Sequence, residues 1–167
     1  MRAMTDGGEV AGTVARRRMT SRELAIWRSL VDVTAELRRI LGGQLQQDSN
    51  LSPADYQVLL ALVEADGQHL RSSGLAASID WERSRLSHHL RRMERRGLVR
   101  RQDCPTDSRG AEVFLTDEGS TAFHGATVPH MRAIKKNFAD ALSPEQFEAL
   151  EDILRSLQRH LHPDDPS

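Results

Sequence analysis

The segment of residues 80–99 constrains the fold of this chain more than any other. Within it, Leu86, Leu90 and Met93 recur at the i, i+4, i+7 spacing of one helix face. Most of the other positions are arginine, serine or histidine. The pattern therefore predicts a single helix that packs one apolar side into a core and presents hydrogen-bond donors on its other side.

The neighbours of this helix indicate a known supersecondary order. A short alanine-rich helix is predicted over residues 75–79, immediately upstream. Two short β-prone pieces, residues 98–101 and 111–115, follow it, and the polar loop between them carries Arg109 near its tip. A short helix, a donor-rich helix and a β-hairpin, in this order, are typical of a winged helix-turn-helix.

Positive charge is concentrated in this part of the chain. Residues 81–109 hold nine arginines and four acidic residues, although the whole chain has a formal net charge of −1. An arginine-rich helix face by itself most often means only a solvated surface. A nearly neutral chain that gathers its positive charge on one helix and one hairpin instead favours binding to a polyanion.

The remaining elements predict a mainly α-helical protein. A long helix over residues 20–47 has a broader apolar stripe than one core contact needs, which favours a partner subunit. Helices are also predicted after Ser52, Thr116 and Ser143, each of which is suited to be an N-cap. Asp80 is the expected N-cap of the donor-rich helix, and Ser72 or Ser73 that of the short helix before it.

The composition argues against several functional classes. Cys104 is the single cysteine, so the chain lacks an internal disulfide and a cysteine-cluster metal site. The apolar runs fall short of the roughly 18 residues of a membrane span, and the first residues lack a secretory h-region, so the cytoplasm is expected. The histidines do not share a helix face at metal-ligand spacing, and catalytic motifs are not found, so neither cofactor nor enzymatic activity is expected.

Three segments together resemble the MarR family of bacterial transcription regulators. They are residues 83–101, the loop residues 107–110 and the following residues 115–119. The likeness extends over about residues 20–162. It implies a homodimer whose first and last helices form a dimerisation layer, with two winged lobes that bind double-stranded DNA at a pseudo-palindromic operator. The implied division is a disordered tail (1–19), dimerisation helices (20–47 and 116–162), a DNA-binding lobe (52–115) and a polar end (163–167).

In such a dimer each donor-rich helix enters a major groove, and its N-terminal half lies nearest the bases. We therefore predict base reading by Ser84, Arg85, Ser87 and His88. Phosphate contacts are predicted for Arg91, Arg92, Arg95 and Ser72 or Ser73, with Arg83 on the same surface. The resemblance assigns Arg109 to the minor groove and Asp107 to bracing a nearby guanidinium.

Many members of the family release DNA when a small aromatic acid binds. Trp27, Val31 and Tyr56 are the residues we place at such a pocket, although core packing explains the two aromatic side chains equally well. The predicted function is a homodimeric repressor that an aromatic ligand releases from its operator. The alternative is a small-molecule-binding or scavenging protein whose winged lobe is vestigial, against which Arg85, Arg91 and Arg109 argue.

Overall fold

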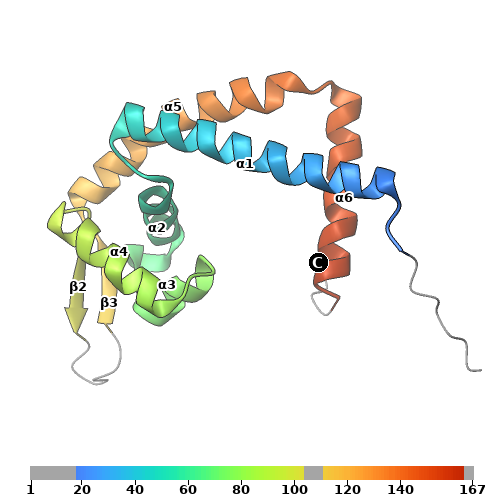
Figure 1. The fold of residues 1–167 in the computed structure, drawn as a ribbon. Coiled ribbons are helices and arrows are strands. Elements are labelled where there is room, and N and C mark those ends of the chain that lie inside the picture. The colour runs from blue at the N-terminus through green and yellow to red at the C-terminus, as the bar shows by residue number, and fades with distance from the viewer. Residues whose placement is uncertain (1–17, 104–110, 164–167) are drawn as a thin grey trace, which may run out of the picture. The chain divides into compact units, whose positions relative to one another are not determined.

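The computed structural model of the protein describes residues 18–103 and 111–163. Contacts divide the chain into two compact units, with the boundary between Ala35 and Glu36, inside the first helix. Helices account for most of the described residues (Figure 1). The helices are α1 (Ser21–Ser49), α2 (Pro53–Glu64), α3 (Ser72–Ser78), α4 (Arg83–Arg95), α5 (Asp117–Asn137) and α6 (Pro144–Leu161), and the strands are β1 (His69–Arg71), β2 (Val99–Asp103) and β3 (Ala111–Leu115).

The first unit is the N-terminal half of α1. Its large apolar side chains, Leu24, Ile26, Trp27, Leu30, Val31 and Val33, are between 37% and 60% exposed. An exposed apolar surface of this size is unusual for a chain that functions alone. This half of α1 therefore has the broad apolar face that the sequence predicts.

The second unit contains one core that α2, α3, α4, α5 and the sheet share. Its fully buried side chains include Leu59 and Leu62 of α2, Leu75 of α3 and Val113 of β3. Leu86, Leu90 and Met93 are each at most 1% exposed, which confirms the apolar side predicted for the donor-rich helix. Burial of this one side fixes which face of α4 remains in solvent.

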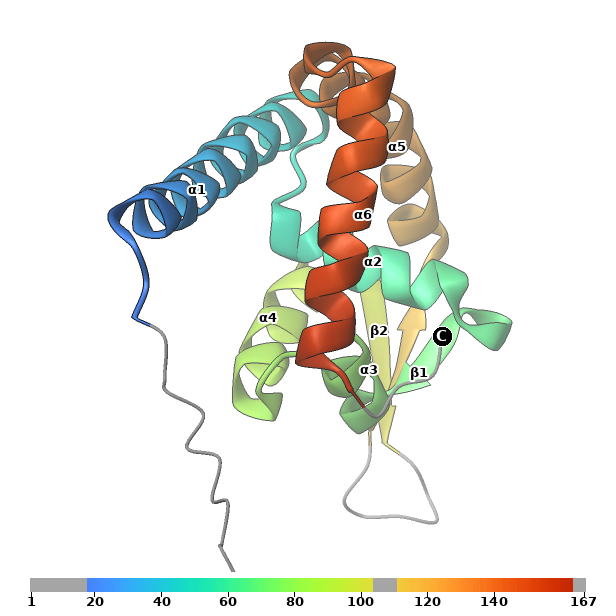
Figure 2. The same cartoon turned by 90° about the vertical axis from the view of Figure 1, so that its right-hand side faces the viewer.

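The sheet contains the two strands predicted for the wing, β2 and β3, and a third strand, β1. The strands lie side by side in the order β1-β3-β2, and both pairings are antiparallel (Figure 2). Leu70 of β1 pairs with Val113 of β3, and the rings of His69 and Phe114 stack with centroids 5.0 Å apart. The sequence indicates a short extended piece at residues 70–71, but not its pairing with β3.

Several predicted helix ends are confirmed. Ser52 and Ser143 each form a capping box, the first with Asp55 and the second with Gln146. The Thr116 hydroxyl accepts a hydrogen bond from the N–H of Gly119 at the start of α5. These bonds satisfy backbone N–H groups that the first turn of a helix leaves without partners.

Two predicted caps are wrong. Asp80 has a φ of 52° in the turn before α4, and Glu82 occupies the N-cap position. Arg71 is the N-cap residue of α3, and the Ser72 hydroxyl instead donates to the carbonyl oxygen of Ala111 at 2.8 Å. The Ser72 hydroxyl therefore binds the sheet and does not cap α3, because Ala111, the first residue of β3, lies within hydrogen-bond distance.

Gly119 is required because α5 closely approaches the backbone of Leu98 at this position. A Cβ atom there would lie 2.0 Å from the carbonyl oxygen of Leu98. We expect Gly119→Ala to lower the free energy of unfolding by about 3 kcal/mol, because backbone must move to relieve the overlap. The measurement is urea denaturation.

Gly125 of the same helix provides the control for this substitution. Apart from its chain neighbours and the backbone of its own helix, no atom of the described residues lies within 4 Å of a Cβ placed there. Gly125→Ala should therefore raise stability by about 0.5–1 kcal/mol, as expected from helix propensity alone. Equal denaturation midpoints for the two variants would contradict the close-approach explanation.

Two further features bear on functional class. None of the helices in residues 18–103 and 111–163 has the length and apolarity to span a membrane. Within the same residues, no three histidine, cysteine or acidic side chains gather where they could hold a metal ion.

Candidate nucleic-acid interface

Helices α3 and α4 and the turn between them form a helix-turn-helix. The turn reverses direction at Asp80, and the Trp81 N–H then donates to the carbonyl oxygen of Ala76 at 2.9 Å. Gly97, with a φ of 72°, follows the last turn of α4 and leads into β2. The order of elements around α4 therefore agrees with the prediction.

The two sides of α4 differ sharply in chemistry. Leu86, His89, Leu90 and Met93 are buried. The exposed side carries all the predicted DNA-binding residues of this helix except the half-buried Ser87. The exposed residues are Arg83, Ser84, Arg85, His88, Arg91, Arg92 and Arg95.

Two surface recesses flank the exposed face of α4, and together they collect eight of the twelve residues predicted to bind DNA. The first has a volume of about 280 Å³ and is lined by Ser72, Ser73, Arg83, Leu86, Ser87, Leu90, Arg101 and Ala111. The second is wider, about 500 Å³, and is lined by His88, Arg91, Arg92, Glu94 and Arg95. The two serines of α3 thus share a recess with Arg83 of α4, and the predicted phosphate-binding arginines of α4 line the other recess.

Arg101 belongs to the first recess and was missed by the sequence analysis. Its side chain donates two hydrogen bonds, at 2.7 and 3.0 Å, to one carboxylate oxygen of Glu94. Its backbone N–H donates to the other oxygen at 3.1 Å. Hydrogen bonds from Arg101, although opposed by partial burial, hold the pKa of the Glu94 carboxyl below its usual value. The pair holds an arginine of β2 beside α4.

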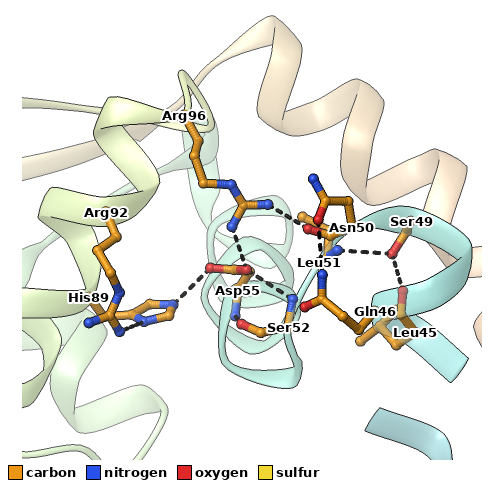
Figure 3. Close-up of polar contacts among 10 residues, drawn as sticks. All are labelled: Leu45, Gln46, Ser49, Asn50, Leu51, Ser52, Asp55, His89, Arg92 and Arg96. Carbon is orange, nitrogen blue, oxygen red and sulfur yellow. Dashed lines mark hydrogen bonds and ion pairs between the residues drawn. The ribbon is translucent and has the colours of Figure 1, made fainter. Parts of the chain in front are cut away.

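A buried ionic cluster ties the C-terminal half of α4 to the start of α2 (Figure 3). Asp55 is 3% exposed, and one of its oxygens accepts a 2.7 Å hydrogen bond from Arg96. Its other oxygen lies 3.0 Å from His89 Nε2, without hydrogen-bond geometry. Arg96 also donates to the carbonyl oxygen of Asn50, just after α1, at 2.6 Å.

The charge state of this cluster follows from its contacts. Burial alone would raise the pKa of Asp55, but contacts with His89, Ser52 and Arg96 outweigh it and hold that pKa well below the usual range. Arg92 lies 2.8 Å from His89 Nδ1, and an arginine only donates hydrogen bonds. His89 Nδ1 is therefore the acceptor, which leaves the ring proton of a neutral His89 on Nε2, toward Asp55.

The structure describes only some of the remaining predicted site residues. Asp107, Arg109 and the Cys104 thiol lie outside the described residues, as do the first 17 residues and the last four. Trp27 and Val31 are 56% and 43% exposed on α1.

Tyr56 lies in an aromatic cluster between α2 and α5. Its ring centroid is 5.0 Å from that of Phe123 and 4.9 Å from that of His130, and its hydroxyl lies 3.4 Å from the Thr127 hydroxyl. Burial lowers the pKa of His130. Its Nδ1 is buried and has no hydrogen-bond partner among the residues described.

A helix-turn-helix with a donor-rich second helix and an adjacent antiparallel sheet defines a winged helix-turn-helix DNA-binding protein. Comparison with known proteins agrees, because residues 49–110 match the model of the MarR family. The structure resembles Sco3205 of Streptomyces coelicolor, a MarR family transcriptional regulator solved in complex with DNA, with 36% identity and a TM-score of 0.79 over 90% of this chain and 95% of that one.

Two other relatives extend the comparison. The transcriptional regulator HosA of Escherichia coli O111:H- is 31% identical over 65% of this chain and 78% of its own length. The organohalide-sensing regulator RdhR, solved with 2,4-dichlorophenol bound, has the same fold at 21% identity, with a TM-score of 0.74 over 98% of this chain and 91% of that one. The chain therefore belongs to the MarR family of transcriptional regulators. Its relatives are regulators and not enzymes.

Proposed function

We propose that this regulator is a repressor that binds a pseudo-palindromic operator as a homodimer, with one α4 helix in each of two successive major grooves. The observation that carries the proposal is the exposed face of α4, where most of the arginine, serine and histidine donors line two recesses, one of which also contains Arg101. Such a surface complements the negative charge of DNA, and its central donors match base edges. The bacterial cytoplasm is where such a protein would act.

Within this interface the proposed roles follow the position along α4. Ser84, Arg85, Ser87 and His88 lie in its first half and read bases. Arg91, Arg92 and Arg95 lie in its second half and bind phosphates, together with Ser72 and Ser73 at the start of α3. Arg83 shares a recess with both serines. Arg109 enters the minor groove, and Asp107 braces it.

Dimerisation is proposed to cover the apolar surfaces of α1 and α6. None of the α6 side chains is buried in the single chain, and those of Ile153, Leu154, Leu157 and Leu161 are between 46% and 69% exposed. A DNA-binding dimer needs two recognition helices at one fixed separation, about one helical turn of DNA. An apolar layer of this kind supplies that separation.

A small aromatic acid or phenol is the proposed effector. The Tyr56 cluster offers aromatic faces and a histidine, which suit a planar ligand with one polar group. The same fold in RdhR accommodates 2,4-dichlorophenol. Such a ligand releases DNA only to the extent that it binds the released state more tightly than the DNA-bound one. Trp27 and Val31 of α1 are proposed as further effector-binding residues, and this assignment rests on the sequence resemblance alone.

Selection of duplexes from a randomised pool, followed by binding titrations, tests the main proposal. We expect the wild-type protein to select an inverted repeat. Arg85→Ala should remove the preference at one position of each half-site, at a cost of about 1–3 kcal/mol on the selected duplex.

Arg95→Ala provides the matched comparison. The Arg95 side chain has no hydrogen bond or ion pair with other residues in the part of the chain described, so its removal changes only the surface. It should weaken binding to all duplexes alike and reduce the salt dependence by about one phosphate contact. If the pool yields no preferred sequence while aromatic acids still bind, the protein is instead a small-molecule-binding protein with a vestigial winged lobe.

A further inference from the structure

Trp81 stands between the two helices of the helix-turn-helix, one residue before the N-cap of α4. Its side chain is half-buried and packs against the hydrophobic core. Its backbone N–H is held by the carbonyl oxygen of Ala76. The position of the indole ring is thus fixed from both the backbone and the core.

One face of this ring supports the guanidinium of Arg85. The Arg85 Cζ lies 4.2 Å from the ring centroid, which is cation–π distance. Arg85 is exposed, and its side chain has no hydrogen bond or ion pair with the other residues that the structure describes. The indole is therefore the contact that defines where the end of this arginine side chain lies.

The ring also contacts the ionic cluster beneath it. The centroids of Trp81 and His89 are 5.3 Å apart, and their planes are nearly perpendicular at 81°. His89 is 5% exposed and is itself held between Asp55 and Arg92. A rigid series of contacts thus extends from the buried carboxylate through His89 and Trp81 to Arg85.

Stacking leaves the hydrogen-bonding capacity of Arg85 intact. An aromatic ring engages the flat face of a guanidinium, whereas the N–H groups project from its edge, in the plane. Guanine O6 and N7 are recognised by two such N–H groups together. An arginine held by its face is therefore restricted in orientation while its edge remains available to a base.

We propose that Trp81 is a positioning residue that sets base preference through Arg85 without touching DNA itself. The inference rests on the proposed function of α4 as the base-reading helix. It predicts that loss of the indole face changes the discrimination between bases at the position that Arg85 reads. Arg85 without its support still has its charge, so binding to unrelated DNA is retained.

The test measures base preference with the full-length protein and duplexes selected from a randomised pool by the wild-type protein. The position read by Arg85 is identified as the one at which Arg85→Ala loses its preference. At that position we expect the wild-type preference of about tenfold or more to fall by about fivefold in Trp81→Leu. Trp81→Phe, which restores an aromatic face, should recover most of it. In the Arg85→Ala background, Trp81→Leu should cause no further loss of preference.

Phe114→Leu is the matched control. It removes the other arginine–aromatic stack in the described residues, in which Arg100 lies 4.4 Å from the Phe114 ring, away from α4. Base preference should be unchanged in this variant. Equal affinities of the wild type and Trp81→Leu for a scrambled duplex would show that the variant is folded.

The stack itself is also measurable in the wild-type protein, without a substitution at Trp81. The ring current of the indole should shift the Arg85 side-chain resonances upfield in the NMR spectrum, and Arg85→Lys assigns them. Unshifted resonances would overturn the inference. Full base preference in Trp81→Leu would also overturn it, as would an equal loss of affinity for the selected and scrambled duplexes. Failure of the wild type to select any sequence would instead refute the proposed function.

Discussion

Asp55→Ala is expected to lower the free energy of unfolding by about 3 kcal/mol, because it removes a buried carboxylate that holds the buried His89 and the partly exposed Arg96. The substitution removes the acceptor of Arg96 and the carboxylate oxygen beside His89, whose side chain is 7% exposed. It also removes half of the capping box at the start of α2. Urea denaturation at neutral pH, followed by circular dichroism, measures the effect.

The loss of unfolding free energy in Asp55→Ala should also depend on pH in a defined direction. The pKa of Asp55 is depressed in the folded state, so its contribution to stability is complete above the unfolded pKa of about 3.9 and is lost as the pH falls toward the folded value. The difference in unfolding free energy between the wild type and Asp55→Ala should therefore become smaller below about pH 4. A difference that stays constant between pH 7 and pH 3 would contradict the assigned charge state.

Glu36→Ala provides the control for Asp55. Glu36 forms an ion pair with Arg39 on α1 at 2.6 Å, but both side chains are more than half exposed. Ion pairs in solvent contribute little to stability, because water competes for both partners. The unfolding midpoint of Glu36→Ala should match that of the wild type, so a loss comparable to that in Asp55→Ala would show that burial is not the cause.

Replacing both Leu154 and Leu157 by glutamate is expected to give monomers and to reduce operator affinity by at least about a hundredfold, because each monomer keeps only one half-site contact. The two side chains are 47% and 46% exposed on α6 and lie near Ile153 on the same stripe. Two negative charges cannot be buried in an apolar interface without partners. Light scattering measures the mass, and a titration with the selected duplex measures the affinity.

Arg159→Glu tests whether added negative charge on α6 is by itself sufficient. Arg159 lies on the side of α6 opposite the apolar stripe. This variant should remain a dimer with nearly wild-type affinity at matched salt. A dimeric Leu154→Glu, Leu157→Glu double variant would refute the proposed dimerisation surface, and a monomer with full operator affinity would refute the two-half-site arrangement.

Local sequence patterns are sufficient to predict the helices that position the site. Leu86, Leu90 and Met93 define one side of α4 through spacing alone, and the arginines therefore had to face solvent. The capping residues Ser52 and Ser143 likewise act on N–H groups within three residues of themselves. Such features are predictable because the atoms involved are neighbours in sequence.

The pairing of strand β1 and the contacts of the Asp55 cluster could be recognised only in the folded chain. Residues 70–71 are short and extended in the sequence, but nothing there identifies Val113 as the residue with which Leu70 pairs. Asp55 is recognisable in sequence as an acid in the first turn of a helix, but its ion-pair partner Arg96 is 41 residues away. Nothing in the spacing of the two residues reveals that pairing.

Trp81 and Arg85 lie between these two cases. Their separation of four residues suits a contact along a helix, yet α4 begins at Arg83, so the ring is placed by the turn at Asp80 and not by helical spacing. Periodicity specifies which side chains of a helix enter the core, because burial of apolar surface repeats with the helix turn. Which exposed arginine is supported, and by which ring, depends on how α3, α4 and α2 pack together, because those contacts join residues that have no fixed relation along the chain.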